Sequence, residues 1–311
     1  MAMSGTYGPA QDDENIATIH AALDGGVNLL DTGDFYGMGH NEMLIARALR
    51  DRNRDEVLIS VKFGAQRGPD GSWLGYDARP AAVKTALAYS LTRLNTDHVD
   101  IYRPARLDPD VPIEETVGAV AEMVEAGHVR YIGLSEVGAE TVRRAAAVHP
   151  ICDLQIEYSL LSRGIERSIL PTCRKLGIAI TAYGVLSRGL LGGRYSADRQ
   201  PTGTDIRGRF PRFQGENLRR NLELVNALEK IADARGVAVA QLAFAWVLSR
   251  GGDIVALAGP RTREQLYDAL GALVLDLDDS ELEQIEHAVP AEAVAGSRYG
   301  EAQMAALDSE R

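Results

Sequence analysis

Three polar side chains of complementary chemistry lie at or just after the ends of two predicted strands. Asp31 ends the predicted strand 27–31, Tyr36 lies in the loop after it, and Lys62 ends the predicted strand 57–62. A phenol with a pKa of about 10 donates a proton poorly at neutral pH, but a neighbouring ammonium favours the phenolate. The three types together predict proton transfer, with Tyr36 as general acid, Lys62 lowering its pKa and Asp31 holding Lys62. For each residue taken singly, a purely structural ion pair at a strand end is the alternative.

These side chains meet only if the strands that carry them run side by side. Short β-branched runs alternate with amphipathic helical patterns along the chain, which predicts parallel strands buried on both faces. The predicted strands are 27–31, 57–62, 98–102, 129–134, 151–155, 178–183 and 254–257. The predicted helices include 41–50, 79–94, 113–126, 140–148 and 165–176.

The arrangement of these elements favours a closed barrel over an open sheet. No glycine-rich phosphate turn opens a helix, as a doubly wound dinucleotide-binding fold would require. In a barrel of alternating strands and helices, chemistry lies at the carboxyl ends of the strands. Ser135, Gln155 and Tyr183 close three later strands and fall at the same end. We expect residues 1–311 to form a single barrel domain.

Two features depart from a minimal barrel. Residues 1–13 are too short and too rich in Gly and Asp for a full first strand, although Met1–Met3 is compatible with the tail of one. A barrel without that strand exposes two sheet edges. Either the sequence begins late, or the edges are covered by the chain itself or by another subunit of a homo-oligomer. The second feature is the long connection 184–216, which is either a binding loop or disordered across 194–209.

The bulk composition is that of an ordinary globular protein. Of the 311 residues, 45% are hydrophobic and 25% are charged, and the formal net charge is −11 with the basic residues scattered. This pattern argues against a nucleic-acid partner and against an anionic membrane surface. No stretch approaches the about 18 to 20 apolar residues of a membrane span, and we expect a cytoplasmic protein. We expect Cys152 and Cys173 to be free thiols.

Several motifs together resemble the aldo-keto reductases over almost the whole chain. They are Asp31-Thr32-Gly33-Asp34-Phe35-Tyr36-Gly37, Lys62-Phe63-Gly64, Tyr131-Ile132-Gly133-Leu134-Ser135, Gln155-Ile156-Glu157-Tyr158-Ser159-Leu160 and Pro211-Arg212-Phe213-Gln214-Gly215-Glu216-Asn217. The resemblance implies a (β/α)8 TIM-type barrel with its first strand missing or truncated, extra helices and a long loop after the seventh strand of the complete barrel. It also implies NADPH as cofactor, bound without a Rossmann fold, and reduction of a small-molecule aldehyde or ketone.

The resemblance also assigns roles to individual residues. Asp31, Tyr36 and Lys62 match the family's catalytic acid, proton donor and amine. Ser135 and Gln155 match residues that hold the nicotinamide carboxamide, and Tyr183 matches the aromatic residue that stacks on the ring. The remaining cofactor positions are Leu186 and Arg188 at the pyrophosphate, and Gly259, Arg261, Thr262 and Gln265 at the 2′-phosphate. Arg261 suits that dianion, which favours NADPH over NADH. No metal ligands are assigned.

One position departs from the family pattern in a way that bears on activity. Ala105 stands where the family has a catalytic His, and a methyl group cannot donate a hydrogen bond to a carbonyl oxygen. Arg103 points to the same side of an extended strand, where it either supplies a cationic donor or forms an ion pair. The leading hypothesis is a slow or specialised carbonyl reductase. The alternatives are an NADPH-binding regulatory protein that reduces nothing, and a lyase that uses Lys62 as a Schiff-base nucleophile.

Overall fold

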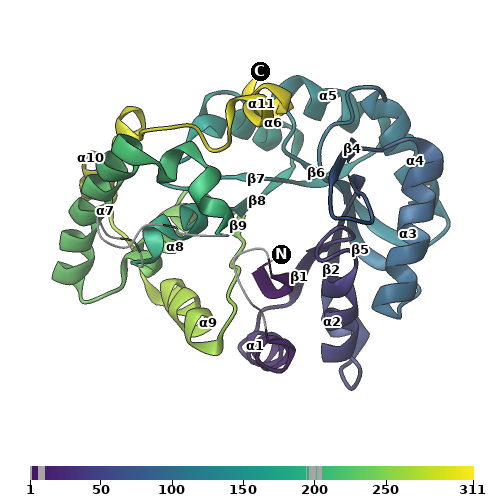
Figure 1. Cartoon of the computed structure of the whole chain (residues 1–311), viewed down its shortest axis with the longest axis horizontal. Coiled ribbons are helices and arrows are strands. Elements are labelled where there is room, and N and C mark those ends of the chain that lie inside the picture. The colour runs from purple at the N-terminus through teal and green to yellow at the C-terminus, as the bar shows by residue number, and fades with distance from the viewer. Residues whose placement is uncertain (1, 6–10, 194, 196–200, 202–204) are drawn as a thin grey trace.

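The core of the protein is a curled sheet of seven parallel strands with helices on its outer side (Figure 1). The computed structural model describes residues 2–5, 11–193, 195, 201 and 205–311. In spatial order, the strands are β1 (Leu29–Gly33), β2 (Leu58–Phe63), β5 (Val99–Pro104), β6 (Val129–Ser135), β7 (Ile151–Glu157), β8 (Ala179–Tyr183) and β9 (Ile254–Ala256). All seven predicted strands are confirmed, and so is a TIM-type barrel whose first strand is missing or truncated, with seven parallel strands in the described residues.

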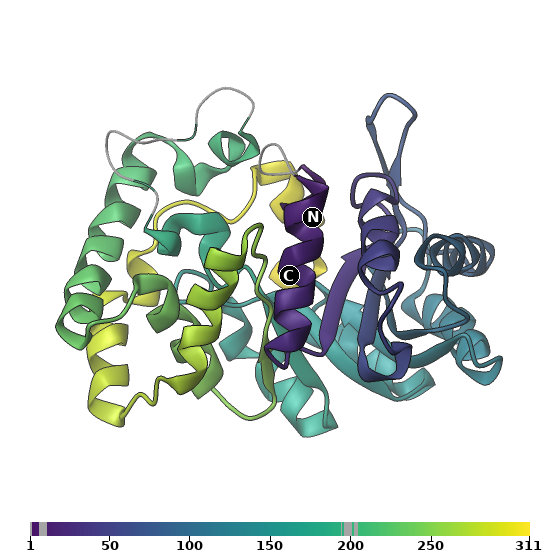
Figure 2. The ribbon, with the colours of Figure 1, turned by 90° about the horizontal axis from the view of Figure 1, so that it is seen from below.

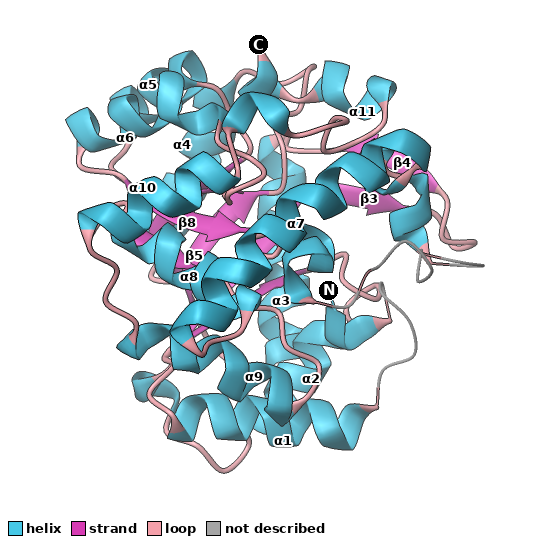
Figure 3. Cartoon of the chain, turned by 90° about the vertical axis from the view of Figure 1, so that its left-hand side faces the viewer, coloured by secondary structure: helices cyan, strands magenta, loops and turns pink. Residues whose placement is uncertain are grey.

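Helices cover the convex side of this sheet, and the strands are seen between and behind them when the molecule is viewed from the side (Figure 3). The α-helices are α1 (Asp12–Asp24), α2 (His40–Ala48), α3 (Pro80–Leu94), α4 (Ile113–Glu125), α5 (Ala139–Val148), α6 (Ile169–Leu176), α7 (Gly215–Arg235), α8 (Val239–Ser249), α9 (Arg263–Leu270), α10 (Asp279–Ala288) and α11 (Glu301–Ala306). The predicted helix 165–176 is wrong at its start. A 3-10 turn over Gly164–Arg167 precedes α6, and Ser168, with φ −144° and ψ −38°, breaks the helical path between them.

The sheet is open between β1 and β9, which are its two edge strands. Helix α1 contacts both α2, which follows β1, and α9, which follows β9. Figure 2 shows α1 on the open side of the sheet. The chain itself therefore covers the outside of the opening, which was one of the alternatives. The possible strand tail at Met1–Met3 is wrong, because Ala2–Ser4 form a 3-10 turn.

Two segments that the sequence pattern left unresolved lie in the loops at the carboxyl ends of the strands. An unpredicted antiparallel hairpin, β3 (Ala65–Arg67) with β4 (Trp73–Tyr76), follows β2 and projects from the molecule (Figure 2). The long connection after β8 contains short 3-10 segments over Ser187–Gly192, Ile206–Arg209 and Pro211–Phe213. Most of the stretch 194–209, for which disorder was one alternative, lies outside the described residues.

Other sequence-based expectations concern membrane helices and thiols. Within the described ranges no single helix has the length and apolar character to cross a membrane, although α7 and α8 pass that test as a pair bent by 92°. Cys152 and Cys173 are both free thiols, as predicted.

A buried acidic cluster follows β1 and anchors the start of the loop that carries Tyr36. The Asp34 amide donates to the carbonyl of Lys62 at 2.9 Å, which ties β1 to the end of β2. Its carboxyl Oδ1 is buried without a hydrogen-bond partner in the described structure. Burial, together with the neighbouring carboxylate of Glu42, raises the pKa of Asp34 to about 7 despite the opposing charge of Arg93. Asp34 is therefore protonated in the folded protein below neutral pH.

The raised pKa of Asp34 makes the stability of the fold depend on pH. Between about pH 4 and 7 the folded state retains a proton on Asp34 that the unfolded chain releases, so this group's contribution to stability falls as pH rises. We expect wild type to lose about 2 kcal/mol of unfolding free energy between pH 5.5 and 8 relative to Asp34→Asn. Urea unfolding at both pH values measures this difference. The exposed Asp51→Asn serves as control, and parallel pH profiles for Asp34→Asn and wild type would contradict the assignment.

Candidate active site

Asp31 lies at the centre of a buried polar cluster at the carboxyl end of the sheet. Parallel pairing sets Asp31 beside Ser60 and Gly33 beside Lys62. The Lys62 ammonium lies 2.5 Å from Asp31 Oδ2. Ser60 Oγ and Gln155 Nε2 donate to Asp31 Oδ1 at 3.0 and 2.8 Å. Both carboxylate oxygens are therefore occupied, and the ammonium is held in one position.

The protonation states of this cluster follow from burial and from two nearby cations. Burial would raise the pKa of Asp31, but the charges of Lys62 and Arg103 outweigh it and lower that pKa. Burial lowers the pKa of Lys62, and Asp31 opposes this shift only in part. The site thus holds a carboxylate that stays ionised beside an amine whose proton is less tightly bound than that of a free lysine.

Tyr36 lies beside this pair, on a loop whose backbone is bent by residues with positive φ. Gly37, Met38 and Gly39 have φ of 59°, 53° and 93°, and the Tyr36 amide donates to the carbonyl of Gly33 at 2.9 Å. The Lys62 ammonium lies 5.1 Å from the centroid of the Tyr36 ring. The structure therefore brings together the predicted acid, amine and phenol.

At the position where the family has a catalytic His, this chain has Ala105, whose side chain cannot donate a hydrogen bond. Ala105 is buried, and its amide donates to the carbonyl of Phe63 at 2.8 Å. The next residue, Arg106, donates to the Ala105 carbonyl at 2.6 Å and to the hydroxyl of Tyr299 at 3.4 Å. His40, the first residue of α2, does not replace that donor, because its ring nitrogens lie 3.1 Å from the Ser4 hydroxyl and 3.1 Å from the Asp12 carboxylate.

Ser135 and Tyr183 occupy strand ends on the other side of the same cluster. Ser135 pairs in register with Gln155, and its hydroxyl is buried without a hydrogen-bond partner in the part of the chain that the structure describes. The Tyr183 hydroxyl donates to Glu136 at 2.7 Å. Gln155 uses one of its two amide hydrogens on Asp31, which leaves its second N–H and its carbonyl oxygen for a ligand.

A buried ion cluster next to Tyr183 was missed by the sequence analysis. Arg298 forms ion pairs with Glu136 at 2.8 Å and with Glu157 at 3.3 Å. Burial raises the pKa of Glu136, but Arg298 overcomes this effect and holds it at about 2. Glu136 follows Ser135 at a strand end, which was a usable signal. Arg298 lies in an irregular segment without periodicity, so no pattern in the sequence marks it.

Leu186 and Arg188 lie in the connection after β8, where the C-terminal segment crosses the same end of the barrel. Leu186 is partly buried against the core and precedes the 3-10 segment. The guanidinium of Arg188 lies 4.2 and 4.5 Å from the ring centroids of Phe210 and Tyr299, which contact each other edge to face, and it donates to the Arg298 carbonyl at 2.9 Å. In this arrangement Arg188 anchors the C-terminal segment.

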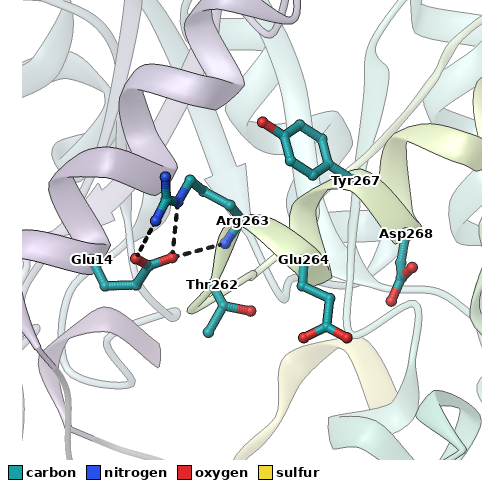
Figure 4. A pocket seen from close by; sticks show the side chains of 6 residues that line it. All are labelled: Glu14, Thr262, Arg263, Glu264, Tyr267 and Asp268. Carbon is teal, nitrogen blue, oxygen red and sulfur yellow. Dashed lines mark hydrogen bonds and ion pairs between the residues drawn. The ribbon is translucent and has the colours of Figure 1, made fainter.

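The four predicted 2′-phosphate residues, Gly259, Arg261, Thr262 and Gln265, lie together between β9 and the first turn of α9. Thr262 caps the helix by accepting from the amide of Gln265, whose side chain accepts from the amide of Arg261 at 3.0 Å. A surface pocket of about 580 Å³ opens beside them, lined by Glu14, Thr262, Arg263, Glu264, Tyr267 and Asp268 (Figure 4). Glu14 of α1 binds the Arg263 guanidinium there at 3.1 Å.

Comparison with known proteins identifies the family. Residues 1–290 match the model of the aldo/keto reductase family. The chain is 41% identical to a probable aldo-keto reductase 1 from Glycine max, covering 96% of this chain and 86% of the relative. It is 40% identical to the NADP(+) aldo-keto reductase yakc from Schizosaccharomyces pombe, over 96% and 89% of the two chains. A glycerol dehydrogenase structure from Gluconobacter oxydans has a TM-score of 0.85 at 31% identity, covering 93% of this chain and 90% of that chain. The chain belongs to the aldo/keto reductase family.

Proposed function

We propose that the protein reduces a small-molecule aldehyde or ketone to an alcohol with NADPH, and that Asp31, Tyr36 and Lys62 carry the proton transfer. The observation that supports this most directly is the buried 2.5 Å ion pair between Lys62 and Asp31 with the Tyr36 ring 5.1 Å from the ammonium. Burial of Lys62 alone would also suit a Schiff-base nucleophile, but the Asp31 carboxylate at 2.5 Å favours the protonated ammonium over the neutral amine that a lyase needs.

The described residues suit a nicotinamide cofactor at the same end of the barrel. The buried Ser135 hydroxyl has no hydrogen-bond partner among the described residues and is a ready donor to a carboxamide, with the side-chain amide of Gln155 beside it. The capped start of α9 and Arg261 suit an anionic phosphate. The relative yakc is named as an NADP(+) aldo-keto reductase, and the structure of an aldo-keto reductase from Klebsiella pneumoniae, 28% identical to this chain, is in complex with NADPH. We therefore propose NADPH as the cofactor, with Tyr183, Leu186, Arg188, Gly259, Thr262 and Gln265 as further contacts.

The side chains of this protein handle the proton that the reaction consumes. Bound NADPH supplies the hydride equivalent to the carbonyl carbon. Tyr36 donates its phenolic proton to the carbonyl oxygen as negative charge develops there. Lys62 stabilises the resulting phenolate, and Asp31 keeps the ammonium oriented toward the Tyr36 ring. Ser60 and Gln155 fix Asp31 and so preserve this geometry between turnovers.

Ala105 leaves the carbonyl oxygen with one donor where the family has two. Losing one such donor typically lowers the rate by about 10²- to 10³-fold. We therefore propose that reduction is slow with simple aldehydes. We also propose a single cytoplasmic barrel domain whose partner is a small carbonyl compound.

The role of Tyr36 is tested by Tyr36→Phe, which removes only the hydroxyl. We expect aldehyde-dependent NADPH oxidation to fall at least about 10²-fold, while the NADPH dissociation constant from fluorescence titration stays at the wild-type value. Tyr89→Phe, on the exposed side of α3, is the matched control and should retain wild-type turnover. Retained turnover in Tyr36→Phe would remove this residue from the proposed mechanism.

The cost of Ala105 is tested by restoring a donor at that position. Ala105→His should raise the turnover of a reactive aldehyde by about 10- to 10³-fold, because it adds the missing hydrogen bond. Ala105 is buried, so the smaller Ala105→Asn is made in parallel in case the imidazole overpacks the site. Thermal unfolding checks that each variant folds. Unchanged turnover in both folded variants would show that the missing donor does not limit the rate.

A further inference from the structure

A second pair of opposite charges is buried deeper in the barrel, next to the catalytic cluster. Arg103 on β5 pairs in register with Lys62 on β2 and is fully buried. Its guanidinium lies 2.9 Å from Asp153 on β7. Thr181 on β8 donates its hydroxyl to the same oxygen of Asp153 at 2.6 Å, and the Cys152 thiol donates to the other oxygen at 3.4 Å. The cation is therefore surrounded by four strands and has no access to solvent.

A direct hydrogen-bonded path joins Arg103 to the catalytic carboxylate. Arg103 Nη2 donates to Ser60 Oγ at 3.1 Å, and Ser60 Oγ donates in turn to Asp31 Oδ1 at 3.0 Å. Asp31 then holds the Lys62 ammonium. Because Arg103 fixes the acceptor side of the Ser60 hydroxyl, its hydrogen must point at Asp31. The guanidinium thus orients a hydrogen bond to the carboxylate that positions the amine.

The barrel interior is shaped around this pair. A Cβ atom at Gly133 on β6 would come within 2.5 Å of Asp153 Oδ1 and 3.0 Å of Arg103 Nε. Gly133 therefore leaves the space that the two side chains fill. A buried ion pair adds little net stability over apolar side chains of similar volume, because desolvation of both charges offsets their attraction. Stability alone is a weak reason for placing a charge here, and the path to Asp31 offers a functional one.

We propose that Arg103 is a positioning residue, which orients Asp31 through Ser60 and sets the pH range in which Tyr36 donates its proton. The proposal rests on the reductase function proposed above. Of the two alternatives for Arg103, a cationic donor to the substrate or an ion pair, its described contacts with Ser60 and Asp153 inside the barrel favour the ion pair. Arg103 acts on the reaction without touching the reacting atoms.

The sign of the effect follows from the charges around Lys62. A nearby cation favours the deprotonated forms of the amine and of the phenol, and Arg103 lowers the pKa of both Lys62 and Asp31. Reduction needs a protonated Tyr36, so activity falls as pH rises through the pKa of the coupled pair. Removing Arg103 should move this fall in activity, the high-pH limb of the pH profile, to higher pH. The charged and titratable groups that face Lys62 or Arg103 are Asp31, Tyr36, Arg106, Cys152 and Asp153.

The test compares four variants of the full chain. Arg103→Met removes the cation, Arg103→Lys keeps it, and Asp153→Asn breaks the ion pair while leaving the cation in place. Arg103→Met combined with Asp153→Asn removes both charges and avoids the unpaired buried carboxylate that could unfold the single variant. Two quantities are measured: the pH dependence of kcat/KM for aldehyde reduction, and the ionisation of Lys62 by NMR of lysine-labelled protein. The chain has only four lysines, so the other three serve as internal references.

We expect both variants that lack Arg103 to move the high-pH limb and the Lys62 titration upward by about one pH unit or more. Arg103→Lys and Asp153→Asn should keep the wild-type position, even where they lower thermal stability. The proposal is overturned if Arg103→Met and the double variant titrate like wild type, or if Asp153→Asn shifts the limb equally. If wild type reduces no aldehyde, the reductase function fails, but the Lys62 titration still decides the role of Arg103.

Discussion

The buried contact between Asp31 and Lys62 is the interaction on which the rest of the site depends. An ammonium removed from water is costly unless a carboxylate neutralises it, and here the carboxylate is in turn fixed by Ser60, Gln155 and the pairing of β1 with β2. Removing either partner would leave an uncompensated buried charge. The parallel register of the first two strands therefore determines both the fold at this end and the position of the ammonium beside the Tyr36 ring.

The sequence predicted the parts of the protein that follow from periodicity and strand ends. All seven strands and the meeting of Asp31, Tyr36 and Lys62 could be foreseen, because parallel strands bring their carboxyl ends to one edge. The break at Ser168 and the hairpin from Ala65 to Tyr76 could not, because short irregular turns leave no hydrophobic period. The roles of Arg298 and Tyr299 depend on where the C-terminal segment crosses the barrel. That segment lies far along the chain from the residues it contacts, so the local sequence pattern does not predict these contacts.

Two nearby residues at the end of β5 shape the interior of this barrel: Arg103 lies within the strand, and Ala105 directly follows its last residue. Ala105 removes a donor from the mouth, whereas Arg103 adds a cation beneath it. In the proposed mechanism, the cation of Arg103 would therefore act on Tyr36 in addition to the ammonium of Lys62. Helix α1, linked to α9 through Glu14 and Arg263, spans the outside of the sheet opening and lies next to the proposed cofactor end. Cofactor binding and closure of the barrel are therefore expected to stabilise each other.

We propose that the site formed by Asp31, Tyr36, Lys62 and the cofactor-binding residues binds NADPH and uses it to reduce a carbonyl compound despite Ala105. The most direct measurement follows NADPH fluorescence as purified protein is added, and then NADPH absorbance after addition of a reactive aldehyde. We expect NADPH to bind saturably and then to be oxidised slowly only when aldehyde is present, with one alcohol formed for each NADPH oxidised. Saturable binding with no oxidation over a range of aldehydes would contradict it and favour a regulatory NADPH-binding protein.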